Sequence, residues 1–297
     1  MRRALVAGWF SFTEVIATVG DERGAEVVGE WLTAAGLPYD VAYADYLRRG
    51  LDLAAVDPAD YSHLVWVCGP VMADPLVDGL LDRFASARRL AIGVSVVDDV
   101  APARFHRVWA RDGDGGRRPD LAAAPPARGA EPAGTPLPGG VPVVATVFAP
   151  VQAEYGDRGR HLEVQAAVEQ WIADRGLGSF DVATDLLTPA GMPRRVGQVQ
   201  AALGRADVVV SSRLHGLVLA LGQGRPVIAC DPVRGGAKVG EQAAALGWPV
   251  LLGADEVTGA GLDAAFARCR GTDVRPDWQW VVRELAELQA EVVAELM

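Results

Sequence analysis

Short apolar segments rich in β-branched residues alternate with longer amphipathic segments along most of the chain. Such alternation is typical of βαβ units built on a parallel sheet. The predicted strands span residues 4–7, 39–44, 64–68, 90–96 and 107–110 in the first half, and 143–148, 180–183, 207–211, 226–230 and 250–252 in the second. The predicted helices span residues 21–36, 75–86, 159–175, 194–203, 215–222, 239–246 and 277–296.

The alternation stops between residues 113 and 142, where a run rich in proline and glycine contains little to bury. We interpret this run as an interdomain linker or a mobile loop. The sequence therefore predicts an α/β protein with two doubly wound Rossmann-like domains, residues 1–112 and 143–274, followed by a terminal segment, residues 275–297. Ligands of doubly wound domains bind at the carboxyl ends of the strands, here in a cleft between the two domains.

The last predicted helix carries a single apolar stripe. The stripe repeats at spacings of 4, 3, 4 and 4 residues and consists of Val281, Leu285, Leu288, Val292 and Leu296. An amphipathic helix of this kind is stable when its apolar stripe packs against another element. We therefore expect this helix to pack back across the domain junction.

Composition narrows the class of protein. Of the 297 residues, 50% are hydrophobic and 22% are charged, which excludes a disordered or fibrous chain. The net charge of −10 repels phosphate backbones, so we expect no nucleic acid partner. Cys68, Cys230 and Cys269 form neither a disulfide framework nor a zinc motif, which indicates buried thiols in a cytoplasmic protein. No segment has the pattern of a secretory signal or a transmembrane span.

The turn after the apolar strand 207–211 carries the most informative chemistry. Ser211 and Ser212 end this strand, and Arg213 and His215 follow at the start of the next helix. The positive end of a helix with a guanidinium beside it favours a phosphate or a carboxylate. The alternative is that Ser212 caps the helix while Arg213 and His215 lie on the surface without a function.

Lys238 is a second candidate for anion binding. It is the one lysine of the chain, and Gly235, Gly236 and Gly240 surround it. These glycines would leave the backbone open to an approaching anion, while the lysine would contribute a point charge. A solvated loop lysine is the alternative interpretation.

The segment from about residue 202 to residue 247 closely resembles the signature of the polysaccharide pyruvyl transferase family. That signature has a strand ending in Ser-Arg-x-His-Gly, then a strand that begins with proline, then Lys-Val. The matching residues are Arg213, His215, Gly216, Pro226, Lys238 and Val239. Gly20, Asp21 and Glu22 resemble the family's N-terminal Gly-Asp-Glu motif more weakly, and Arg111 with Asp112 resembles its Arg-Asp pair.

The resemblance implies a fold like that of the GT-B glycosyltransferases. It also implies transfer of pyruvate from phosphoenolpyruvate to saccharide hydroxyls as a ketal, with phosphoenolpyruvate as co-substrate and no other cofactor or metal. His215 is suited to donate the proton, because an imidazole titrates near neutrality. The donor site would comprise Arg213 and Lys238 as anion ligands, together with Ser211, Ser212 and Gly216.

The acceptor side is expected at Gly20, Asp21 and Arg111. Asp21 could accept a bond from a sugar hydroxyl or act as a base, and a helix cap is the alternative for this residue. We expect a saccharide acceptor, either a small molecule or lipid-linked. The other histidines, His63, His106 and His161, are weaker candidates for a role in the reaction.

Two other functions remain open at this point. A GT-B glycosyltransferase would need an acidic residue to hold the ribose of a nucleotide sugar, and Asp231 and Glu241 follow the Pro226 strand without a clear pattern. A non-catalytic relative would keep the anion pocket alone. The N-terminal half departs from the family pattern, with Thr18-Val19 where the family usually has asparagine, which makes such a relative worth considering.

Overall fold

The computed structural model describes residues 2–47, 49–98, 100–113, 117–125, 142–187, 193–271 and 276–297. The chain forms two compact units, each with its own parallel sheet. The first unit comprises Met1–Ala122, Asp185–Leu187 and Val282–Met297, and the second comprises Ala123–Thr184 and Thr188–Val281.

The sheet of the first unit has seven strands within the described residues, in the order β3-β2-β1-β4-β6-β5, with β7 also paired to β6. All of these pairings are parallel. The strands are β1 (Ala4–Ala7), β2 (Tyr39–Tyr43), β3 (Leu51–Asp52), β4 (His63–Val67), β5 (Pro70–Val71), β6 (Arg88–Val96) and β7 (Arg107–Asp112). The helices are α1 (Val19–Ala34), which packs on β1, β2 and β4, and α2 (Pro75–Arg83). The central strands β1 and β4 are buried along their whole length, as expected of a parallel sheet covered on both faces.

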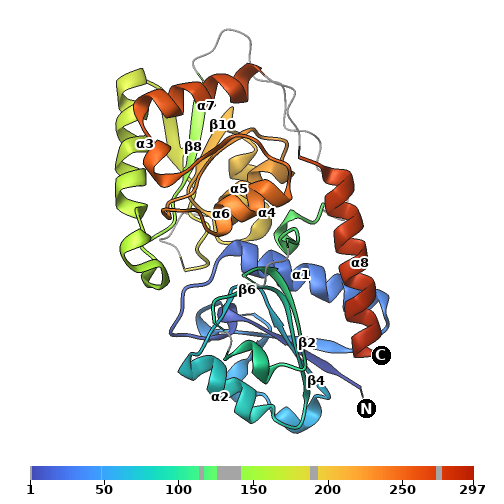
Figure 1. The fold of residues 1–297 in the computed structure, drawn as a ribbon. Helices are drawn as coiled ribbons and strands as arrows, with labels where there is room; N and C mark the ends of the chain where they lie inside the picture. The colour runs from blue at the N-terminus through green and yellow to red at the C-terminus, as the bar shows by residue number, and fades with distance from the viewer. Residues whose placement is uncertain are drawn as a thin grey trace. The chain divides into compact units, whose positions relative to one another are not determined.

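The sheet of the second unit has the strand order β12-β11-β10-β8-β9, again with every pairing parallel. Its strands are β8 (Val143–Val147), β9 (Gly178–Asp181), β10 (Val208–Ser211), β11 (Val227–Cys230) and β12 (Leu251–Leu252). The helices are α3 (His161–Arg175), α4 (Val196–Leu203), α5 (Leu214–Gly222), α6 (Lys238–Ala245) and α7 (Gly259–Gly271). Figure 1 shows α3 and α7 on one face of this sheet and α4, α5 and α6 on the other.

These two parallel sheets confirm the predicted fold class of two doubly wound, Rossmann-like domains. The alternation of apolar strands and amphipathic helices placed most elements within a few residues of their observed bounds. The exceptions are the short strands β3 and β5 and the helix α7, which the sequence analysis did not predict. Cys68, Cys230 and Cys269 are free and buried, as predicted.

The predicted linker requires a correction. Residues 114–116 and 126–141 of the run 113–142 lie outside the described residues, but Asp120 and Leu121 are completely buried. The side chain of Leu121 lies over Gly93, whose φ of +66° and close neighbour leave no room for a Cβ atom. Asp120 forms an ion pair with the buried Arg111. This part of the run therefore belongs to the core of the first unit, although its neighbours in sequence have little to bury.

The last helix, α8 (Trp278–Leu296), buries the predicted stripe of Val281, Leu285, Leu288, Val292 and Leu296. From Val282 onward it belongs to the first unit, whereas the chain before it belongs to the second. The chain thus returns to the first unit at this helix, while its predicted packing across the junction stays a prediction.

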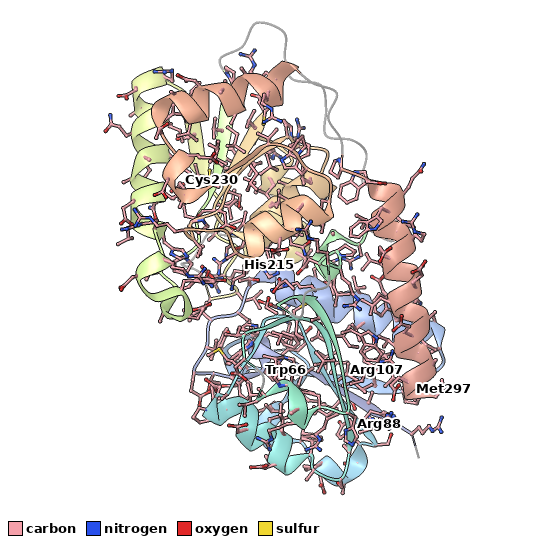
Figure 2. The ribbon with its side chains drawn as sticks, viewed as in Figure 1. Trp66, Arg88, Arg107, His215, Cys230 and Met297 are labelled. Carbon is pink, nitrogen blue, oxygen red and sulfur yellow. The ribbon has the colours of Figure 1, made fainter. Side chains whose placement is uncertain are left out.

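Polar contacts fix the last turns of α8. Glu291 accepts a hydrogen bond of 2.8 Å from the indole N–H of Trp109 and lies 3.0 Å from the guanidinium of Arg107. Glu295 forms an ion pair with Arg88. Figure 2 labels Arg88 and Arg107 beside this end of the helix, close to Met297.

The burial of the α8 stripe can be tested with two valines of the same helix. Val292 is fully buried and Val282 is 49% exposed. We expect Val292→Ala to lower the free energy of unfolding by about 2 kcal/mol, because two buried methyl groups are lost. Val282→Ala should change it by less than about 0.5 kcal/mol. Urea unfolding followed by circular dichroism measures both, and equal effects would mean that the stripe is not buried.

Candidate functional site

The carboxyl edge of the second sheet brings three helix starts together. Strands β8, β10 and β11 are parallel neighbours, so the segments that follow them all leave the sheet at one edge. These segments lead into α3, α5 and α6, whose first residues or N-caps include Arg160 and His161, Arg213 and His215, and Lys238. Each helix start contributes a partial positive charge. The edge therefore combines helix ends with basic side chains, which is the arrangement that favours an anion.

The turn between β10 and α5 is braced by its two serines. The hydroxyl of Ser211 accepts a hydrogen bond of 3.1 Å from the backbone N–H of Arg213 and donates one of 2.7 Å to its carbonyl. The hydroxyl of Ser212 accepts a hydrogen bond of 3.0 Å from the backbone N–H of Ala149, in the loop after β8. The alternative of Ser212 as the helix cap is therefore wrong: Arg213 occupies the N-cap position, and its side chain makes no capping bond.

Gly216 has a packing role in this turn. A Cβ atom at Gly216 would overlap the hydroxyl of Ser211 and would lie 2.7 Å from Cγ1 of Val147. Helix α5 is buried over nearly its whole length, so it cannot move away to make room. The glycine thus lets the first turn of α5 lie directly against β8 and β10, while a direct contact of Gly216 with a donor stays a prediction.

Arg213 and His215 lie where the sequence placed them, at the N-cap and in the first turn of α5. His215, labelled in Figure 2, is only 7% exposed, and Arg213 is half-buried. The imidazole is therefore not a surface group, as the alternative interpretation would require. Their predicted roles as proton donor and anion ligand stay predictions.

The start of α6 differs from the sequence prediction. The carboxylate of Asp231 accepts hydrogen bonds from the backbone N–H groups of Ala237 at 2.7 Å and Gly240 at 2.8 Å. Asp231 therefore satisfies two of the backbone donors that were expected to be open to an anion. Lys238 is not a solvated loop residue either, because its ammonium lies 3.5 Å from the Glu154 carboxylate and 5.5 Å from the ring centroid of Tyr155.

His161 is the candidate that sequence reasoning undervalued. It is the first residue of α3 and is 2% exposed, with its ring stacked on Tyr155 at a centroid distance of 6.2 Å. Burial lowers its pKa, and the positive charge of Lys238 adds to that effect, while Glu154 opposes it. One sequence signal could have found it, since His161, like His215, opens a helix that follows an apolar strand.

On the first unit, the Asp21 side chain helps to cap the start of α1. Thr18 is the N-cap of α1, and its backbone N–H donates to the Asp21 carboxylate at 2.9 Å. The backbone N–H of Asp21 donates in return to the Thr18 hydroxyl at 3.3 Å. This reciprocal pair is a capping box. The capping alternative for Asp21 is thus present in the structure. Its role as a base and the place of Gly20 on the acceptor side stay predictions.

Arg111 lies in a buried ionic cluster. Its guanidinium pairs with Asp112 at 3.2 Å and with Asp120, and donates to the Ser95 hydroxyl at 2.9 Å. Burial disfavours the charged guanidinium, but the charges of Asp120 and Asp112 outweigh that effect and raise the pKa of Arg111. The charge of Asp21 has a smaller effect in the same direction. Asp21 and Arg111 are both bonded within the protein.

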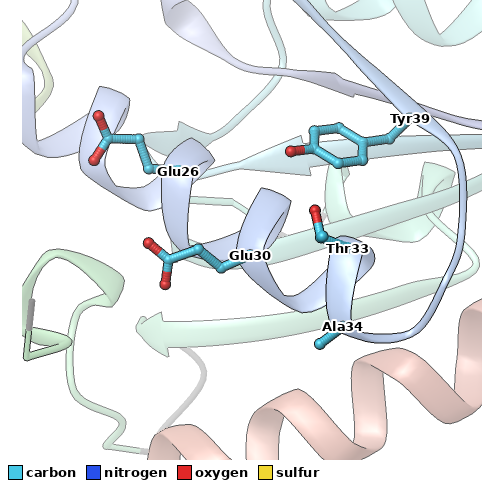
Figure 3. Close-up of a pocket in the computed structure, with 5 residues that line it drawn as sticks. All are labelled: Glu26, Glu30, Thr33, Ala34 and Tyr39. Carbon is cyan, nitrogen blue, oxygen red and sulfur yellow. The ribbon is translucent and has the colours of Figure 1, made fainter. Parts of the chain in front are cut away.

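A separate open pocket of about 520 Å³ lies on the later turns of α1 and the start of β2. Its lining residues are Glu26, Glu30, Thr33, Ala34 and Tyr39. Figure 3 shows the two carboxylates projecting from successive turns of α1. Arg23 pairs with both glutamates, at 3.2 and 3.1 Å. This pocket contains none of the predicted acceptor-side residues, and the glutamates already have a cationic partner.

Comparison with known families bears on the second unit. Residues 167–232 match the family model of the polysaccharide pyruvyl transferases. The predicted resemblance is confirmed. The match contains Arg213, His215 and Gly216 but ends before Lys238, and it does not include the N-terminal motif residues. It supports a transferase of the class that modifies polysaccharides. No curated protein matches the chain.

Three solved glycosyltransferase structures align with the chain at low sequence identity and low TM-score. The calicheamicin glycosyltransferase CalG4 is 14% identical, with a TM-score of 0.40 and coverage of 99% of this chain and 94% of that one. The glycosyltransferase of kitacinnamycin is 13% identical, with a TM-score of 0.41 and coverage of 99% and 95%. SnogD from Streptomyces nogalater is 16% identical, with a TM-score of 0.38 and complete coverage of both chains.

Two further observations concern the described part of the chain. No three histidine, cysteine or carboxylate side chains in it are grouped so that they could hold a metal ion. None of its helices combines the length and the apolar character that crossing a membrane requires.

The packing role of Gly216 can be tested against a glycine of the same helix. Gly222 has open space where its Cβ would lie, so Gly222→Ala should be neutral or stabilise the fold by up to about 1 kcal/mol through helix propensity. Gly216→Ala should instead destabilise it by about 1–3 kcal/mol, because Ser211 and Val147 must move. Thermal and urea unfolding of the two variants measure the difference, and a stabilising Gly216→Ala would exclude the close approach.

Proposed function

We propose that the chain is a pyruvyl transferase that moves pyruvate from phosphoenolpyruvate to two hydroxyls of a saccharide, forming a ketal. The observation that carries the proposal is the start of α5, where Arg213 and His215 occupy a helix end at the carboxyl edge of the sheet, inside the segment that matches the family. The proposed setting is the cytoplasm, which is supported by the three free, buried cysteines.

The first step of the proposed reaction is a proton transfer to the donor. His215 gives a proton to C3 of phosphoenolpyruvate, so the methylene becomes a methyl group and C2 becomes an oxocarbenium-like electrophile. One acceptor hydroxyl adds to C2, the C2–O bond to phosphate breaks, and the second hydroxyl completes the ketal. Of the two hydroxyl protons released, one restores the imidazolium and one leaves on inorganic phosphate.

Arg213 would hold the donor through its carboxylate or phosphate. A guanidinium presents parallel N–H donors to such groups, and it keeps its charge throughout the reaction. Its position at the N-cap of α5 adds the positive end of the helix to the same anion. The acceptor is proposed to be a saccharide, either small or lipid-linked, recognised on the side of Gly20, Asp21 and Arg111.

The nucleotide-sugar alternative has less support from the second unit. The acidic residue that would hold a ribose was sought after the Pro226 strand, at Asp231 or Glu241. The Asp231 carboxylate instead accepts hydrogen bonds from the backbone N–H groups of Val233, Ala237 and Gly240. Glu241 is exposed.

Two variants test the proposal, one through donor binding and the other through turnover. Arg213→Ala should weaken phosphoenolpyruvate binding by about 1.5–3 kcal/mol, or roughly tenfold to more than a hundredfold. His215→Gln should bind phosphoenolpyruvate nearly as well as the parent and lose about 10²–10⁴ in turnover. Calorimetry measures binding, and phosphate release with a panel of saccharides measures turnover. Arg205→Ala, at an exposed position of the same unit, is the matched control and should change neither.

Three outcomes decide between the functions. Thermal stabilisation by phosphoenolpyruvate but not by UDP or GDP sugars, with turnover to phosphate, supports the pyruvyl transferase. Reaction in deuterated water should then place deuterium in the product methyl group. Stabilisation by a nucleotide sugar alone would favour a glycosyltransferase, and binding of phosphoenolpyruvate without turnover would favour the non-catalytic relative.

A further inference from the structure

His161 is a buried polar side chain that the proposed function leaves unexplained. It is 2% exposed, and neither of its ring nitrogens makes a hydrogen bond to any described residue. Burying a polar atom without a hydrogen bond is unfavourable, so such atoms in native proteins usually have a partner that is absent from the coordinates. The imidazole therefore points to a ligand.

The backbone holds His161 against the loop that follows β11. The N–H of Arg160 donates to the Pro232 carbonyl at 2.7 Å, and the N–H of Arg234 donates to the Arg158 carbonyl at 2.9 Å. Gly159 and Val233 form an isolated bridge between the same two segments. The start of α3 is thereby fastened to the segment that leads into α6.

Tyr155 links His161 to Lys238. Its ring stacks on the imidazole at 6.2 Å with an interplanar angle of 27°, and the Lys238 ammonium lies 5.5 Å from the centroid of the same ring. The Lys238 ammonium also lies 3.5 Å from the Glu154 carboxylate, so a phosphate bound here would compete with that carboxylate for the ammonium. The imidazole at the start of α3 and the ammonium at the start of α6 thus contact the same tyrosine ring.

Burial of His161 favours the neutral form of its imidazole before a ligand binds. Burial is the main cause of its lowered pKa, and Lys238 acts in the same direction. The carboxylates of Glu154, Asp231 and Glu163 act in the opposite direction but do not prevail. A dianionic phosphate beside the ring would add negative charge and accept a hydrogen bond, both of which favour the imidazolium.

We propose that His161 and Lys238 form a subsite for a phosphate group and that His161 takes up a proton when the phosphate binds. The inference rests on the proposed function in assigning this phosphate to phosphoenolpyruvate. The subsite belongs to the starts of α3 and α6, whereas Arg213 and His215 belong to the start of α5. If His161 and Lys238 bind the phosphate, Arg213 would bind the carboxylate of the donor.

The experiment is an NMR titration of the imidazole nitrogens with inorganic phosphate at about pH 7.5, one unit above the ordinary histidine pKa. The chain has 4 histidines, so the spectrum is simple, and His161→Gln assigns the relevant signals. We expect the His161 nitrogens to change from the neutral to the imidazolium pattern as phosphate saturates. His63 and His106 should keep their patterns, because they lie in the first unit.

Lys238→Gln tests the second member of the subsite. It should weaken phosphate binding about tenfold or more and shift the His161 transition to correspondingly higher phosphate concentrations. Arg205→Gln removes the same charge from an exposed position of the same unit and should leave the transition unchanged. A His161 that stays neutral at saturating phosphate would overturn the proposal, as would a parent protein that binds no phosphate.

Parallel titrations with phosphoenolpyruvate and UDP distinguish the sources of the phosphate. Protonation of His161 by phosphoenolpyruvate supports the full inference. If UDP protonates His161 and phosphoenolpyruvate does not, the phosphate subsite stands and its assignment to phosphoenolpyruvate is overturned together with the proposed function. If the protein turns over phosphoenolpyruvate while the His161 nitrogens keep the neutral pattern, the subsite alone would be overturned and the proposed function would stand.

Discussion

A parallel sheet requires that all of its strands end at one edge, and the chemistry of the second unit depends on this constraint. Because β8, β10 and β11 are neighbours, the helices that follow them begin side by side, each with its unsatisfied N–H groups and its positive end. The protein satisfies the start of α6 with its own carboxylate, Asp231. It places Arg213 and His161 at the starts of α5 and α3. The helix starts at this edge therefore favour an anion through their geometry, and the basic side chains add to that effect.

The two units use the same kind of edge for different purposes. In the first unit, Thr18 and Asp21 bond to each other at the start of α1, and Arg111 is matched by Asp112 and Asp120. In the second unit, basic side chains lie at three helix starts, and the His161 nitrogens have no hydrogen bond from a described residue. A buried ion cluster of the first kind fixes the shape of a loop, because leaving one partner unmatched would be costly. A site of the second kind keeps its capacity for a ligand.

The sequence predicted what is local and missed what depends on contacts between distant segments. Strand and helix positions followed from periodicity, and Arg213 and His215 from their place between an apolar strand and an apolar helix. The capping of α6 by Asp231 and the buried position of Asp120 and Leu121 were missed, because each depends on a loop folding back onto another element. His161 was undervalued for the same reason, since its environment is made by Tyr155 and by a loop about seventy residues later in the chain. Helix α7 was missed because small residues dilute its apolar pattern.

The position of α8 has a consequence for how the protein is made. The first unit is assembled from the beginning of the chain, from Asp185–Leu187 and from the residues after Val281, and the second unit comprises the segments between them. During synthesis the strands of the first unit emerge from the ribosome first. Trp109 and Arg107 can form their contacts with Glu291 only after the whole second unit has been translated. The second unit has no such delay, because all strands of its sheet lie between Val143 and Leu252, with only Asp185–Leu187 of the first unit among them. The part of the protein that is made first is thus the part that is finished last.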